Sequence, residues 1–446
     1  MSAEELFDLA HQVLRASEAE ATEVVVIRED VTLTRYANNR IHQNTRTDTL
    51  VVGVRLTEGR KQGTGWLHRP DPEGIRHLVH QVQGSLAYVP EDPEIPEPFG
   101  PARTIQEWHE DPATPEELAE VARRVFQHAG DERQAFGMVS TARVEHVYLN
   151  SAGAEGYRPF TDVLLNVSMK AEGGGSGWAQ AAAPSLQALA VEETAERAAR
   201  KADLSRHPEP LEPGVYPVIL EPLALSELLA YLAFLGFSGR RVLERRSPLA
   251  GRFGQRVFSP LLTLEDHPLD PTLFPYAFDW EGVPRRRLTL VDQGVPTQPV
   301  YNRRWARKAG TESTGHAVFP FTDWISPTHL VVHPGQTPAR DLLHLADRAI
   351  LVTRLWYTNV EDPMTLTLTG MTRDGTFLVE KGNIVKGVRN LRFTQSVMDL
   401  LKGPFVFSRE RERVSETLFY DFRLPAGSLV PWAFFEAFRF TGVTQF

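Results

Sequence analysis

The chain has 446 residues, of which 42% are hydrophobic and 24% are charged, a balance typical of a folded protein with two or three domains. Its 48 basic and 57 acidic side chains give a net charge of −9, which disfavours nucleic acids and anionic membranes as partners. The absence of cysteine excludes disulfides, thiolate nucleophiles and zinc sites with a sulfur ligand. Any chemistry must therefore use histidine, carboxylate or hydroxyl groups.

The first segment, residues 1–21, has apolar residues at helical spacing among acidic ones. This pattern predicts an amphipathic helix and not a signal peptide. The longest apolar stretch, Leu223–Phe237, contains Glu227 and is shorter than the ~20 residues that a membrane span requires. We therefore expect a cytoplasmic protein that binds neither a membrane nor nucleic acid directly.

The rest of the amino-terminal half alternates between strand-like and helix-like segments. The proline-rich segment 89–101 supports neither regular element. The glycine-rich segment 173–177 predicts a flexible loop. The expected strands are residues 23–28, 31–36, 50–56, 139–150 and 161–171, and the expected helices are residues 71–83, 114–128 and 186–203.

A second proline-rich segment, residues 207–214, marks the expected domain boundary. It separates an amino-terminal α+β domain, residues 1–210, from a β-rich carboxy-terminal domain, residues 211–446, with a buried apolar helix at 223–235. We predict an α+β fold of two domains with large, mostly antiparallel or mixed sheets and flanking helices. The later expected strands are 216–220, 287–291, 329–333, 349–357, 364–371, 376–381 and 384–392, and the later expected helices are 339–346 and 393–401.

Common catalytic patterns are weak in this sequence. His329 and His333 are four residues apart, but in a strand they lie ~13 Å from each other, too far to share one metal ion. The segment Gly174–Trp178 lacks the last glycine of the G-x-S-x-G turn of serine hydrolases, and phosphate-binding glycine patterns are missing. We interpret the arginine clusters at 240–241, 245–246, 285–287 and 303–304 as solvated faces and ion pairs.

Several longer strings are more specific. The segment Arg35–Asn44, RYANNRIHQN, resembles the R-x-A-N-N-x-I-x-Q signature of the TldD/PmbA family, whose members were once called modulators of DNA gyrase and are now understood as subunits of peptidase complexes. The chain is identified as a member of this family, with the fold of the family implied, because further matching strings follow in the family's order. These strings are Asn150–Gly153, Gly175–Gly177, Ser247–Gly254, Phe278–Gly282, Ala306–His316 and the region around Gly382–Ile384.

The resemblance also indicates a branch of the family. The TldD branch binds zinc through H-E-x-x-x-H on a helix and a distant cysteine, whereas the PmbA branch, also called TldE, lacks these ligands and pairs with it. The matching positions here are Ser226, Glu227 and Tyr231, and no histidine occurs between His207 and His267. Neither a serine hydroxyl nor a phenol replaces a neutral imidazole as a zinc ligand at neutral pH. We therefore expect no catalytic residue, no metal site and no cofactor in this chain, and a structural role for Glu227.

The resemblance then implies a function. We expect a non-catalytic, metal-free PmbA/TldE-like subunit that pairs with a TldD-type zinc metallopeptidase acting on unfolded peptides, with zinc held only by the partner. Sheet edges can bind an extended peptide through main-chain hydrogen bonds. The candidate contacts to peptide or partner are Asn38, Asn39, Arg40, His42, Gly175, Ser176, Gly177, Thr314 and His316.

Two alternatives stay open at this point. The first is a self-sufficient hydrolase with a non-zinc site around His316, which pairs with Glu312 or Asp323. The second is a homodimeric binding or regulatory protein linked to DNA gyrase modulation, as the older family name implies. Peptide hydrolysis by the isolated chain distinguishes the first alternative from the other two functions.

Overall fold

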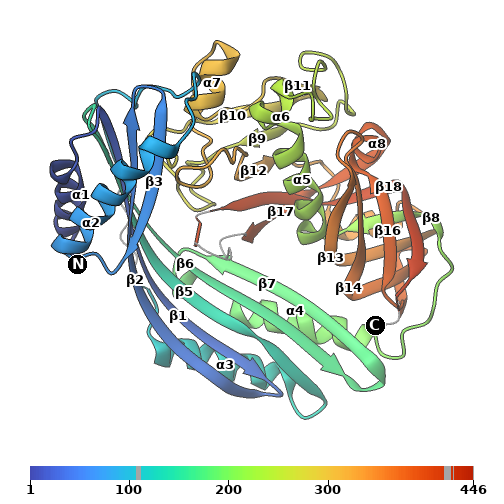
Figure 1. Ribbon diagram of the computed structural model, residues 1–446. Helices are drawn as coiled ribbons and strands as arrows, with labels where there is room; N and C mark the ends of the chain where they lie inside the picture. The colour runs from blue at the N-terminus through green and yellow to red at the C-terminus, as the bar shows by residue number, and fades with distance from the viewer. Residues whose placement is uncertain (107–111, 416–422, 425, 445–446) are drawn as a thin grey trace.

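The computed structural model describes residues 1–106, 112–415, 423–424 and 426–444. Two large β-sheets with helices packed against them form an α+β fold (Figure 1). The predicted fold class is therefore confirmed. The first sheet contains the strands up to Ala183, and the second contains the strands from Gly214 onward. We propose that the domain boundary lies between these strands, at residues 210 and 211.

Seven strands form the first sheet in the order β3-β2-β1-β5-β6-β4, and β7 also pairs with β6. All neighbours are antiparallel except β4 and β6. The central strand β1 pairs with β2 on one side and β5 on the other, which places Val25 between Gly53 and Tyr148. The strands are β1 (Ala21–Ala37), β2 (Arg40–Glu58), β3 (Lys61–His68), β4 (Ala102–Ile105), β5 (Arg133–Asn150), β6 (Ala154–Ala171) and β7 (Gly175–Ala183).

Four helices cover this sheet, and their starts follow from local sequence. Ser2 with Glu5, and Thr114 with Glu117, form capping boxes that satisfy free backbone N–H groups of the first turn. The apolar faces of α1 and α2 share a core with β1 and β2, and those of α3 and α4 share a core with β6 and β7. The helices are α1 (Ala3–Ala16), α2 (Pro72–Ser85), α3 (Pro115–Ala129) and α4 (Val191–Leu204).

Eleven strands form the second sheet, in which β18 pairs with β8, β12, β16 and β17. Its β14 contacts β7 and α4 of the first part, so the two sheets meet along this line. The strands are β8 (Gly214–Leu220), β9 (Leu264–Asp266), β10 (Leu288–Asp292), β11 (Val295–Pro296), β12 (His329–Val332), β13 (Arg348–Asp362), β14 (Thr367–Glu380), β15 (Asn383–Gly387), β16 (Leu391–Ser396), β17 (Phe405–Ser415) and β18 (Gly427–Val443).

Helix α5 is the apolar helix of the second part. It runs Pro222–Gly236, begins with a proline in its first turn, and buries side chains on most sides against β13, β17 and β18. Three short α-helices are also found among the described residues of this part, and none of the helices that the structure describes is long and apolar enough to cross a membrane. The short helices are α6 (Gly239–Leu243), α7 (Arg303–Ala309) and α8 (Val397–Lys402).

Three local predictions are wrong. The glycine-rich segment 173–177 is not a loop throughout, because Gly175 already belongs to strand β7. The segment expected as a helix at 339–346 forms a 3₁₀ helix at Ala339–His344. The first half of the helix expected at 393–401 is strand β16, and helix α8 starts only at Val397, where the Ser396 side chain caps it.

Candidate functional site

Helix α5 places the three residues that match the zinc motif of the TldD branch. Ser226 is fully buried, whereas Glu227 and Tyr231 are partly buried. The hydroxyl of Tyr231 donates a hydrogen bond to the carbonyl oxygen of Thr358 on β13 at 2.6 Å. The Tyr231 hydroxyl therefore faces strand β13 of the second sheet.

This set of donors does not fit a zinc ion. Burial and the neighbouring Glu227 raise the pKa of Tyr231, so its phenol stays protonated at neutral pH. A serine hydroxyl is equally unsuited as a zinc ligand. Among the described residues, no group of three or more histidine, cysteine, aspartate or glutamate side chains is arranged to hold a metal ion. The residues at the motif positions of α5 therefore supply no zinc site.

Glu227 lies close to a charged cluster instead. Burial raises its pKa, and the attraction of Arg354 on β13 opposes this rise. Arg354 forms an ion pair with Asp374 on β14 and stacks its guanidinium on the rings of Trp178, at 4.8 Å, and Trp356, at 5.0 Å. A charge held between aromatic faces and a carboxylate is fixed in place. Arg354 thus connects the α5 region to the first sheet through Trp178.

Ser176 makes a second contact across the two sheets. Its hydroxyl donates to Oδ1 of Asp374 at 2.6 Å, and its backbone N–H donates to the hydroxyl of Ser205 at 2.8 Å. The two neighbouring glycines are buried, and a side chain on Gly175 or Gly177 would come closer than 3.0 Å to a backbone carbonyl of helix α4. The glycines of this string therefore allow close packing of β7 on α4, which the sequence alone did not predict.

The asparagines of the amino-terminal signature form a tight turn between β1 and β2. Asn38 and Asn39 have positive φ values of 53° and 58°, a conformation that asparagine tolerates better than most residues. The side chain of Asn39 donates to the Arg133 carbonyl at 2.9 Å and accepts from the Ala135 N–H at 2.7 Å. This turn is tied to the start of β5. Arg40 and His42, which follow at the start of β2, are exposed.

His316 lies in a third place, the loop that follows α7. It is buried, with Nε2 3.1 Å from Oδ2 of Asp266 and Nδ1 2.9 Å from the hydroxyl of Thr314. Burial lowers the pKa of His316, although the neighbouring Asp266 carboxylate opposes this effect. The expected pairing with Glu312 or Asp323 is wrong, since Glu312 is exposed and Asp323 pairs with Arg304 at 3.1 Å. A substrate cannot reach a histidine so enclosed.

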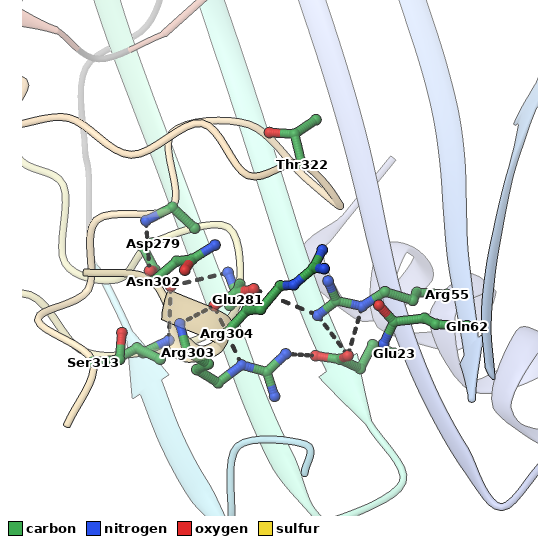
Figure 2. Close-up of polar contacts among 12 residues, drawn as sticks. Glu23, Arg55, Gln62, Asp279, Glu281, Asn302, Arg303, Arg304, Ser313 and Thr322 are labelled. Carbon is green, nitrogen blue, oxygen red and sulfur yellow. Dashed lines mark hydrogen bonds and ion pairs between the residues drawn. The ribbon is translucent and has the colours of Figure 1, made fainter. Parts of the chain in front are cut away.

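The predicted contact residues therefore fall into three separate groups: the β1–β2 turn, strand β7 and the loop after α7 (Figure 1). The structure also shows a charged cluster that sequence reasoning missed. Glu23 of β1 and Arg55 of β2 form an ion pair at 2.6 Å, and Arg303 of α7 and Glu281 complete the cluster from the second part (Figure 2). Glu281 lies in the matching string Phe278–Gly282, which was the available signal for this contact.

Comparison with known proteins shows the family. The sequence pattern described as the PmbA/TldA metallopeptidase C-terminal domain matches residues 213–442, and that of the central domain matches residues 108–206. The chain belongs to the PmbA/TldD metallopeptidase family. This confirms the resemblance found in the sequence.

Solved structures agree with this PmbA/TldD assignment at the level of the fold. TldE from Thermococcus kodakarensis is similar with a TM-score of 0.87 and 22% identity over 99% of this chain and 100% of that one. A protein named as a candidate modulator of a DNA gyrase, from Thermotoga maritima, is similar with a TM-score of 0.83 and 20% identity over the same shares.

Two metalloproteases of the family match this chain over only part of their sequences. The Metalloprotease PmbA of Escherichia coli O157:H7 is 33% identical over 102 residues, or 23% of this chain and 22% of that protein. A Metalloprotease of Methanothermobacter thermautotrophicus is 22% identical over 219 residues, or 48% of this chain and 47% of that protein. The matched stretches thus span less than half of the length of either relative.

Proposed function

We propose that this PmbA/TldD-family chain is a non-catalytic, metal-free subunit of the PmbA/TldE type that pairs with a TldD-type zinc metallopeptidase. The observation that carries the proposal is the set of side chains on α5. Ser226 and Tyr231 stand at the two positions where the TldD branch has histidines, the Tyr231 hydroxyl is bonded to a backbone carbonyl, and the chain has no cysteine. Glu227 therefore has no metal-bound water to activate.

The likeness in fold to TldE of Thermococcus kodakarensis supports the choice of branch. An open sheet edge supports the proposed handling of unfolded peptides. Among the described residues, β2 pairs with β3 only from Val51 to Glu58, and the Leu50 carbonyl accepts from the Arg69 N–H, so residues 40–49 have a backbone neighbour on one side alone. The free side can form main-chain hydrogen bonds with an extended chain of any sequence. In this account Arg40 and His42 contact peptide or partner through this edge.

Ser176, Gly175 and Gly177 belong to a second proposed contact region, because β7 lies where the two sheets meet. Asn38 and Asn39 hold the turn that sets the start of the open edge. Thr314 and His316 are buried, so we propose that they act on the partner or peptide only by supporting the loop after α7.

Reconstitution tests the proposal. Purified chain, purified TldD-type partner and their mixture are assayed on an unfolded fluorogenic peptide, with size exclusion to detect the complex. We expect no hydrolysis by this chain alone, co-elution with the partner, and faster hydrolysis by the mixture than by the partner alone. Hydrolysis by the isolated chain, or a mixture that neither co-elutes nor gains activity, contradicts the proposal.

Two variants assign the activity to one subunit. When the general-base glutamate of the partner is replaced by glutamine, the mixture must be inactive, since this chain contributes no catalytic group. Glu227→Gln in this chain keeps the shape and removes only the charge, so the mixture should retain its rate within about twofold. A loss of ~100-fold with Glu227→Gln would instead show that this carboxylate takes part in the chemistry.

A further inference from the structure

A cavity of about 580 Å³ lies between the β6–β7 hairpin of the first sheet and strands β13 and β14 of the second. Its size falls within the range of about 300–1,000 Å³ that small ligands and single residues of a peptide occupy. Lys170, Gly174 and Ser176 line it from the first sheet, and Arg373 and Asp374 line it from the second. The cavity therefore exists only where the two parts of the chain meet.

The charges around this cavity are predominantly positive. Lys170, Arg373 and Arg389 line it, and Asp374 is the only acidic residue among the lining residues that the structure describes. Asp374 is already engaged, because it pairs with Arg354 and accepts a hydrogen bond from Ser176. Asp374 also lies 3.6 Å from Arg373. No ion pair among the described residues includes Lys170 or Arg389, and the Lys170 ammonium lies 5.1 Å from the centre of the Phe136 ring. A positive cavity on a chain of net charge −9 indicates an anionic ligand.

The walls of the cavity combine charged and apolar side chains. Arg373 stacks on Trp356 at 4.7 Å, and Trp356 in turn covers Arg354. Tyr357 is 70% exposed and, with Met371, adds apolar surface. Cations beside apolar surface suit a ligand with one charged group on an organic body better than an inorganic ion.

We propose that this cavity binds the terminal carboxylate of a peptide. The inference rests on the proposed function, since it gives the peptide-binding subunit a preference for the carboxy-terminal end. Lys170 and Arg389 pair with the carboxylate. The apolar surface of Tyr357 and Met371 in the same cavity favours a carboxylate carried on an organic body over inorganic phosphate.

Binding to the isolated full-length chain tests this assignment. The probe is an unstructured peptide without acidic side chains, prepared with a free terminal carboxylate and, separately, with an amidated terminus. Calorimetry, together with the fluorescence of Trp178 and Trp356 near the cavity, gives the dissociation constants. We expect the free acid to bind about tenfold more tightly than the amide, as loss of a charge-assisted contact predicts.

Variants locate the effect. In the double variant Lys170→Gln, Arg389→Gln, the free acid and the amide should bind with equal affinity, and both residues are exposed, so the fold is retained. The control variant Arg340→Gln removes an arginine whose side chain is 87% exposed and which lines a different cavity. It should keep the tenfold preference.

Equal binding of acid and amide by the native chain overturns the inference, and so does a preference that survives the double variant. Tight competition by inorganic phosphate, but not by acetate, assigns the cavity to phosphate and likewise contradicts it. These outcomes are independent of the reconstitution experiment. A chain that fails to stimulate a TldD-type partner yet prefers the free acid refutes the proposed function alone.

Discussion

Replacing Glu23 by glutamine tests how the two parts of the chain are held together. Glu23 is buried on β1, pairs with Arg55 of β2 and Arg303 of α7, and accepts a hydrogen bond from the hydroxyl of Tyr148 at 2.6 Å. In the variant, the two guanidinium groups share only Glu281, whose oxygens lie 3.4 Å from Arg303 and 3.7 Å from Arg55. One positive charge is then left without its partner in a buried place.

The structure indicates how much stability the Glu23→Gln variant should lose. Burial alone raises the pKa of Glu23, but the attraction of Arg303 and Arg55 outweighs it and lowers the pKa from 4.5 to about 2. A depression of this size corresponds to about 3 kcal/mol of stability at neutral pH. Removing one member of a buried ion pair typically costs about 3–5 kcal/mol. We therefore expect Glu23→Gln to lower the free energy of unfolding by about 3–5 kcal/mol.

Urea unfolding followed by circular dichroism measures the change. The matched control is Glu192→Gln, because Glu192 pairs with Arg124 at the surface, with both side chains exposed, and should cost at most about 1 kcal/mol. The folded-state pKa of Glu23 is depressed, so its stabilisation is present above pH 4.5 and is lost as the pH falls towards 2. The gap between native and Glu23→Gln protein should narrow over this range. A loss of stability in Glu23→Gln no larger than that of Glu192→Gln would show that Glu23 does not hold the two parts of the chain together.

Two further predictions concern stability. Gly177→Ala should lower the free energy of unfolding by about 1–3 kcal/mol, because the new methyl group collides with the Ala198 carbonyl of α4. Gly84→Ala, in the exposed part of α2, should instead raise the free energy of unfolding by up to about 1 kcal/mol. Thermal unfolding of both variants checks this, and equal effects of the two substitutions would contradict it. Burial and the neighbouring Arg285 lower the pKa of His329 to about 3, so below pH 6.5 the unfolded chain binds a proton that the folded chain excludes. The free energy of unfolding, measured with urea, should therefore be lower at about pH 5 than at about pH 7.5. Equal free energies of unfolding at the two pH values would contradict a buried neutral histidine.

Much of the fold could be predicted because its signals are local. Residues 50–56 are apolar and were predicted as a strand, and the apolar helix at 223–235 corresponds to α5. Residues 45–49 of β2 were not predicted as a strand, because they are all polar and exposed and so show no apolar alternation. The helix predicted at 393–401 was wrong for its first four residues, because they belong to β16, whose pairing with β14 and β18 overrides the local preference for a helix.

The site was harder to predict, because its contacts join residues far apart in the sequence. The partners of His316 were sought nearby, at Glu312 and Asp323, yet the carboxylate beside it is Asp266, which lies 50 residues away. The same holds for Ser176 and Asp374, which are 198 residues apart. Sequence patterns show which residue types are available, but tertiary packing decides which of them meet.

The absence of a zinc site in this chain is tested most simply by the zinc content of the purified chain, measured together with its peptidase activity. We predict zinc far below one equivalent and no hydrolysis of unfolded peptide, with or without added zinc, because Ser226 and Tyr231 cannot replace imidazole ligands. One zinc ion per chain, removed by a chelator together with hydrolytic activity, would contradict it.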